Sequence, residues 1–243
     1  MFESLRSQYK SFSSRRKIRR EKPEIWLLED KKVGYVQIPK VATRSIRASL
    51  SKSILEGQGV FVDYDELDGQ MVKGVEQYST IRATQAHIQK LRSEYFIFSF
   101  IRDPYERLYS CYKNKVIAPL TNNKRNVLAK HGIELGIPFE EFVGRVSMIP
   151  DSQADRHIRS QSWFVTDGES LVVDFLGRLE HFHEDWAKLA DKFGLPEPTV
   201  QNASDKGSDN SYNPYTEKAL GIVQQRYAKD IELYNAALTG LGS

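Results

Sequence analysis

The stretch "YFIFSFIRDPYERLYSCYKNK", from Tyr95 to Lys115, decides the fold. Its first seven residues are apolar on both faces, which is typical of a central strand in a parallel sheet. Asp103 is a good N-cap, Pro104 suits the first helical position, and Glu106 completes a capping-box pattern. The sequence therefore predicts a buried strand that passes directly into a helix.

The rest of the chain continues this alternation of strands and helices. We expect further strands at residues 32–38, 59–64 and 170–180, and helices at residues 45–53, 139–146, 183–193 and 217–238. A polar loop is expected at residues 201–216. This order predicts an α/β fold with a central parallel sheet flanked by helices.

Length, charge and cysteine content exclude several classes of protein. The chain has 243 residues, a net charge of +3 and one cysteine, Cys111, so no internal disulfide framework is expected. No apolar run approaches the roughly 20 residues that cross a bilayer, and no secretory leader is expected. We predict a cytoplasmic protein with one domain, residues 23–243.

Residues 1–22 read as a separate basic arm that contains "RRKIRREK". It is interpreted as a solvated leader, as a lip for an anionic substrate, or as a peripheral contact with a membrane surface. No nucleic-acid motif accompanies the block, so nucleic acid is not an expected partner.

The end of the first predicted strand has the composition of an anion cradle. In "IPKVATRS", Lys40 supplies a cation, and Thr43 and Ser45 supply hydroxyl donors. A turn from strand to helix also directs free backbone N–H groups and the helix dipole at one point. The predicted phosphate-binding or sulfate-binding residues are Lys40, Val41, Ala42, Thr43, Arg44 and Ser45. The alternative is an ordinary loop with a surface lysine, and a Walker loop is absent.

A second anion site is predicted at the end of the strand in the opening stretch. Arg102 lies at the strand tip, and Arg107 and Ser110 share one face of the following helix. Arg102 and Ser110 can grip a phosphate by charge-assisted hydrogen bonds. The alternative is that Arg102 pairs with a nearby carboxylate and that Ser110 only fills space.

Together the two motifs resemble the sulfotransferase superfamily. The similarity is greatest to carbohydrate sulfotransferases of the chondroitin, HNK-1 and uronosyl 2-O types, and it extends over residues 33–234 through "DRHIRSQSWFV" and later blocks. This resemblance implies a P-loop NTPase-like fold. It also implies the donor 3′-phosphoadenosine 5′-phosphosulfate (PAPS), whose phosphosulfate would lie on the first motif and whose 3′-phosphate would lie on the second.

The first motif departs from the family in two places. The family often has Gly where this chain has Ala42, and alanine resists positive φ. Arg44 supplies an additional cation. The Golgi anchor of the family is also missing from the sequence, which suggests a soluble, bacterial-type member.

Sulfuryl transfer requires a stabilised leaving group and a base. Lys40 and the loop N–H groups are expected to stabilise the leaving phosphate without a metal. His87 resembles the catalytic histidine of the uronosyl 2-O-sulfotransferases and is the candidate base. Asp63, Asp65 and Glu66 could serve as the base instead, and Asp63 and Glu66 are also candidate acceptor contacts. His157 is a candidate contact to the acceptor or the cofactor, and Lys206 is a candidate cofactor contact.

The leading hypothesis is therefore a PAPS-dependent sulfotransferase whose acceptor is a glycan or glycoconjugate. Two alternatives remain open at this point. One is a P-loop-type nucleotide kinase, which would need a magnesium ligand and a Walker lysine. The other is a non-catalytic module that binds anionic glycans on a sulfotransferase scaffold.

Overall fold

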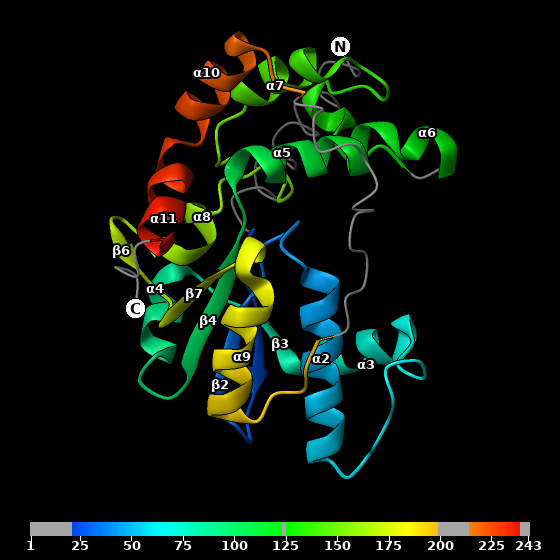
Figure 1. Ribbon diagram of the computed structural model, residues 1–243, viewed down its shortest axis with the longest axis vertical. Coiled ribbons are helices and arrows are strands. Elements are labelled where there is room, and N and C mark those ends of the chain that lie inside the picture. The colour runs from blue at the N-terminus through cyan, green and yellow to red at the C-terminus, as the bar shows by residue number, and fades with distance from the viewer. Residues whose placement is uncertain (1–20, 123–124, 199–213, 239–243) are drawn as a thin grey trace, which may run out of the picture.

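A computed structural model describes residues 21–122, 125–198 and 214–238 (Figure 1). A five-stranded sheet forms its centre, in the order β3-β1-β2-β4-β7. The strands are β1 Glu24–Leu28, β2 Val33–Val36, β3 Thr80–Arg82, β4 Phe96–Ile101 and β7 Phe175–Arg178. Two short strands, β5 Thr166–Asp167 and β6 Ser170–Leu171, pair separately.

The centre of the sheet is parallel, as predicted, and its edge is not. β4 pairs in parallel with β2 on one side and with β7 on the other. β1 is antiparallel to both β2 and β3, so the sheet as a whole is mixed. Neither β1 nor β3 was predicted. The α/β class and the central position of β4 are confirmed.

β4 passes directly into helix α5, Pro104–Tyr112, and Figure 1 shows α5 lying across the top of the sheet. The Asp103 carboxylate accepts the Glu106 N–H, as an N-cap should. The predicted capping box is only half formed, because the Glu106 carboxylate pairs with Arg102. The Asp103 N–H donates instead to Glu180.

Helices cover the sheet and extend beyond its top edge. In Figure 1, α2 Thr43–Gly57 and α9 Phe182–Phe193 lie over the face turned to the viewer. The remaining α-helices are α3 Gly69–Ser79, α4 Gln85–Leu91, α6 Pro119–Asn122, α7 Phe139–Ser147, α8 Ser162–Val165, α10 Glu217–Arg226 and α11 Ala228–Leu238. A π-helical turn, Lys113–Ile117, extends α5, and the 3₁₀ turns are Ala129–His131 and Leu179–His181. No helix in the described part of the chain has the length and apolarity needed to span a bilayer.

Three predicted elements differ from the structure. Residues 59–64 form a loop rather than a strand, because the edge beside β1 is taken by β3 and Phe61 stays 80% exposed. The predicted strand 170–180 divides into β6 and β7, since the Asp174 carboxylate binds the Ile97 N–H between them. The predicted helix 217–238 breaks at Tyr227, whose hydroxyl donates to the Ile158 carbonyl.

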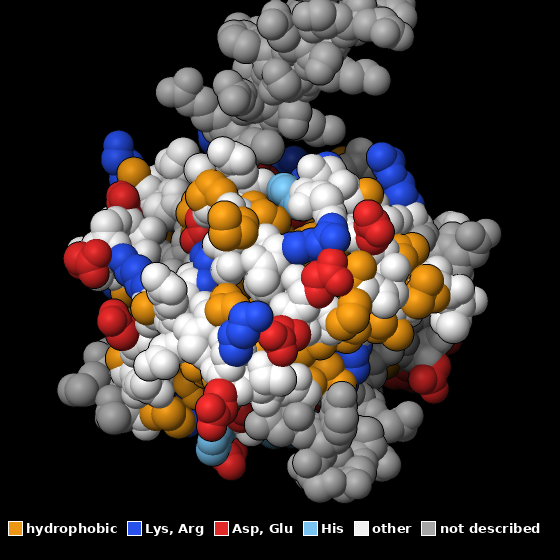
Figure 2. Space-filling view, turned by 90° about the horizontal axis from the view of Figure 1, so that it is seen from above, with side chains coloured by type: hydrophobic (Ala, Val, Ile, Leu, Met, Phe, Trp, Pro, Cys, Tyr) orange, Lys and Arg blue, Asp and Glu red, His pale blue; other side chains and the backbone are white. Residues whose placement is uncertain are grey.

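The apolar residues form two separate clusters. One surrounds the sheet and includes Trp26, Phe98 and Trp186. The other joins α5, α7 and α10 above the sheet and includes Phe142 and Val223. Seen from above, the coloured surface of this helical layer mixes cations, carboxylates and apolar groups (Figure 2). The mild positive excess of the chain is therefore not gathered on that visible surface.

Candidate active site

The two predicted anion sites lie at the same edge of the sheet. β2 and β4 are parallel neighbours, with Tyr35 beside Phe98, so both strands end at the top of the sheet in Figure 1. Ligands of α/β sheets bind at such carboxyl ends. The structure thus brings the turn after β2 next to the strand tip at Arg102.

The turn after β2 has an unusual backbone. Lys40 has φ 75° and Ala42 has φ 53°, so both residues adopt the left-handed conformation that glycine prefers. The Thr43 hydroxyl donates to the Ile38 carbonyl at 2.8 Å and closes the turn. Ala42 is the N-cap of α2 and offers no side-chain acceptor to the first turn of the helix. Such a turn leaves backbone N–H groups free for an anion.

Lys40 is half-buried and has no hydrogen bond or ion pair with another described residue. Burial lowers the pKa of Lys40 to about 8, and the charges of Lys115, Arg102 and Arg44 lower it further. Only an ionised Cys111 thiolate would oppose this effect, and burial raises the pKa of Cys111 to about 11. The positive charges of Lys115, Arg102 and Arg44 thus act against the charge of Lys40, and a bound anion would relieve this repulsion.

The backbone of Arg102 is fixed by two hydrogen bonds, whereas its side chain has one ion pair. The Gln161 side chain accepts the Arg102 N–H at 3.0 Å and donates to the Arg102 carbonyl at 2.7 Å. The Arg102 guanidinium lies 3.2 Å from the Glu106 carboxylate, whose side chain is 60% exposed. The Arg102 side chain is itself only 19% exposed, so the pair joins a mostly buried guanidinium to a carboxylate that is open to solvent. Ser110 lies on the same helix and is partly buried.

Arg107 of α5 is bonded to the backbone of two neighbouring segments. Its side chain is buried and donates to the backbone carbonyls of Pro39, Arg159 and Arg156 at 3.1, 2.9 and 3.4 Å. These bonds occupy its guanidinium, so Arg107 supports the site instead of gripping a phosphate. It joins the β2 turn to residues 156–159.

His157 lies on this joined segment and forms a close pair with Asp155. Its Nδ1 is 2.7 Å from the Asp155 carboxylate, which also accepts the His157 N–H. Burial lowers the pKa of His157, and the Lys115 charge lowers it as well, while Asp155 acts in the opposite direction. The Lys115 charge thus lowers the pKa of both Lys40 and His157.

The other predicted site residues lie elsewhere or outside the described residues. His87 is exposed in the first turn of α4, where its N–H is bonded to Thr84. Asp63, Asp65 and Glu66 are exposed in the loop that joins α2 to α3. Lys206 falls outside the described residues. No contact among the described residues connects His87 or these carboxylates to Lys40.

Sequence reasoning missed Lys115 and Asp155. Lys115 lies in the π-helical turn, whose wider spacing rotates it out of the ordinary helical register. The "DRH" spacing offered a signal for Asp155, because an aspartate commonly accepts the backbone N–H two residues later. In the described ranges, no group of three or more His, Cys, Asp or Glu side chains is placed to hold a metal ion.

Comparison with known proteins places the chain in a family. Carbohydrate sulfotransferase 10 of Homo sapiens and of Pongo abelii are each 29% identical to it over 137 residues. Each alignment covers 49% of this chain and 36% of the relative, so the match spans about a third of these proteins. No solved structure gives a significant match. The model of the sulfotransferase family matches residues 23–236, and the chain therefore belongs to the sulfotransferase family.

Proposed function

We propose that the protein transfers a sulfuryl group from PAPS to a hydroxyl or amine of a carbohydrate acceptor. The observation that carries this proposal is Lys40, a half-buried cation without a partner in the described residues, in a left-handed turn beside three further cations. Family membership supplies the reaction class. The names of the two relatives support a carbohydrate acceptor.

The proposed chemistry is an in-line displacement at sulfur. Residues 40–45 would bind the phosphosulfate, and Lys40 would stabilise the charge that develops on the leaving phosphate oxygen. Arg102 and Ser110 would bind the 3′-phosphate, with Arg102 exchanging Glu106 for the ligand. Lys206 stays a predicted cofactor contact. PAPS supplies the sulfuryl group, and no step of this scheme uses a metal.

The acceptor side of the proposal rests on candidate residues from the sequence. His87 is the sequence-based candidate for the base, and Asp63 and Glu66 are the sequence-based acceptor contacts. All three are exposed and accessible to a large glycan. The cytoplasmic location and the membrane contact of the basic arm stay predictions.

The test is radiolabelled sulfate transfer from PAPS to a panel of oligosaccharides, glycolipids and small alcohols. We expect transfer to at least one glycan and competitive inhibition by adenosine 3′,5′-bisphosphate. Magnesium-dependent phosphate transfer from ATP in the same assay would favour the kinase alternative. Heparin binding by a folded protein that transfers sulfate to no acceptor would instead favour a glycan-binding module.

A further inference from the structure

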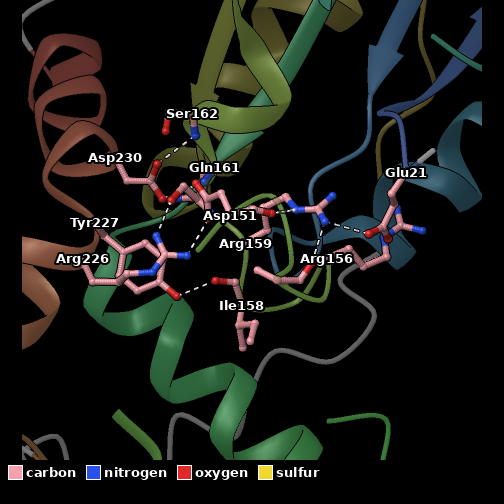
Figure 3. A network of polar contacts seen from close by, with 12 residues as sticks. Glu21, Asp151, Arg156, Ile158, Arg159, Gln161, Ser162, Arg226, Tyr227 and Asp230 are labelled. Carbon is pink, nitrogen blue, oxygen red and sulfur yellow. Dashed lines mark hydrogen bonds and ion pairs between the residues drawn. The ribbon is translucent and has the colours of Figure 1, made fainter. Parts of the chain in front are cut away.

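Residues 151–161 form an irregular segment that leads into α8, and many side chains hold this segment (Figure 3). Inside the segment, the Arg159 guanidinium donates to the carbonyls of Asp151 and Ala154 at 2.9 and 2.6 Å. Asp151 in turn accepts the Ser160 N–H at 3.0 Å. Loops usually lack such a network, so this segment is built to hold a fixed shape.

The two C-terminal helices fix the same segment from outside. Figure 3 shows Arg226, Tyr227 and Asp230 facing it. Arg226 pairs with Asp151 at 2.6 Å, and the Tyr227 hydroxyl donates to the Ile158 carbonyl at 2.6 Å. The buried Asp230 carboxylate accepts the N–H groups of residues 161 and 162 at 2.7 and 2.8 Å. Interactions from the far end of the chain thus hold residues on both sides of residues 155–157.

Arg107 then ties the backbone that precedes His157 to the backbone that precedes Lys40. Its guanidinium binds the carbonyls of Pro39 and Arg156, the residues that directly precede Lys40 and His157. A guanidinium is only a few ångströms across, so the backbones at Lys40 and His157 are close together. His87 has no comparable connection among the described residues.

The groups around His157 favour a neutral, oriented imidazole. Asp155 binds Nδ1, which fixes the tautomer with a proton on that atom and leaves Nε2 as the acceptor. The charged groups that act on the ring are Asp155, Lys115 of the π-helical turn and Arg156 of the same segment. Lys130 lies behind Asp155, with its Nζ 3.4 Å from the carboxylate.

From this geometry we infer that His157, oriented by Asp155, takes the proton from the acceptor hydroxyl during transfer. The acceptor oxygen forms a bond to sulfur while the bond from sulfur to the donor phosphate oxygen breaks and leaves its electron pair on that oxygen. The acceptor proton passes to Nε2 of His157. The inference rests on the proposed function and assigns the base to His157 rather than to His87. Asp155 is a positioning residue.

The test compares His157→Asn with the exposed matched control His183→Asn. Asparagine can still donate an N–H to Asp155 but cannot act as the base. We expect His157→Asn to lower kcat about 10²- to 10⁴-fold. Its affinity for adenosine 3′,5′-bisphosphate should stay within twofold of the wild-type value. Its urea-unfolding midpoint should equal that of the wild type within error. His183→Asn should change none of the three quantities.

Asp155→Asn supplies a readout that a structural role would not give. The Asp155 charge raises the pKa of His157, so its removal should move the acid limb of the pH profile of kcat/KM to lower pH. Unchanged kcat in His157→Asn, with activity lost in His87→Asn, would overturn the inference and leave the proposed function standing. Wild-type protein that transfers sulfate to no acceptor would overturn the proposed function itself.

Discussion

The ends of β2 and β4 lie side by side but are built in opposite ways. At the β2 end, two non-glycine residues adopt positive φ, and Lys40 lacks an ion-pair partner in the described residues. At the β4 end, Gln161 satisfies both backbone groups of Arg102, Asp103 caps α5, and Glu106 neutralises the guanidinium. Strain and unpaired charge therefore concentrate at β2, where we place the chemistry, while β4 provides support and binding.

The largest effect is expected when the unpaired cation at the β2 end is removed. Lys40→Met keeps most of the apolar stem but leaves the departing phosphate without its cation. We expect sulfuryl transfer to fall at least 10²- to 10³-fold. The measurement is kcat for radiolabelled transfer, with the exposed surface variant Lys90→Met as control. A nearly wild-type kcat in Lys40→Met would contradict the proposal that the chemistry takes place at the β2 end rather than at the β4 end.

The support at the β4 end can be broken from a distance. Asp230→Ala leaves two buried N–H groups without an acceptor, and one of them belongs to Gln161, which holds Arg102. We expect the free energy of unfolding to fall by about 2–3 kcal/mol. Urea denaturation measures this change. The exposed neighbour on α11, Glu232→Ala, should alter stability by less than about 0.5 kcal/mol.

Substitutions at Arg102 and Glu106 test whether the Arg102 charge binds the phosphate of the ligand or only supports the fold. Arg102→Ala should weaken adenosine 3′,5′-bisphosphate binding by about 10- to 100-fold, because it removes a charge-assisted contact to phosphate. Glu106→Gln removes the competing carboxylate and should strengthen binding slightly. Calorimetry measures both affinities. If both substitutions weakened bisphosphate binding equally, binding would require the intact ion pair between Arg102 and Glu106.

The low pKa of Lys40 predicts a pH dependence at the β2 end. The free protein loses the Lys40 proton near pH 8, whereas a bound phosphate raises this pKa by favouring the charged form. Bisphosphate affinity should therefore fall by up to about tenfold for each pH unit above 8, until the pKa of the complex is passed. Lys40→Met should lack this limb. The same fall in affinity with pH in the variant would mean that a group other than Lys40 causes the pH dependence.

The smallest effect concerns the strained backbone. Ala42 sits at φ 53°, a conformation that costs a non-glycine residue roughly 1 kcal/mol. Ala42→Gly should therefore raise the free energy of unfolding by a few tenths to about 1 kcal/mol, after the entropy of the unfolded chain is considered. Ala86→Gly, on the exposed side of α4, should lower it by about 1 kcal/mol.

The strand-to-helix unit at residues 95–112 could be predicted because its signals are local. The apolar run, the cap at Asp103 and Pro104 all act within a few residues. The segment 59–64 has the same kind of strand propensity but pairs with no strand of the sheet, and β3 takes the place beside β1. Whether such a segment becomes a strand depends on its pairing in the folded protein, and the local sequence does not report that pairing.

The candidate site divides in the same way. That Lys40 and Arg102 lie at the same edge of the sheet was predictable, because one follows β2 within a few residues, the other directly follows β4, and parallel strands bring their ends together. The placement of residues 156–161 against the turn after β2 depends on Arg107, Tyr227 and Asp230, which bind backbone groups far away in sequence. No local pattern reports such contacts, so only the folded structure indicates them.

One titration tests the central claim that the β2 turn is an anion site prepared for chemistry. Adenosine 3′,5′-bisphosphate is titrated calorimetrically into wild-type protein and into Lys40→Met at pH 7, with equal unfolding midpoints confirmed first. The account predicts a single site in the wild type and at least tenfold weaker binding in the variant. Binding of equal strength in both proteins, or no binding to the folded wild type, would contradict it.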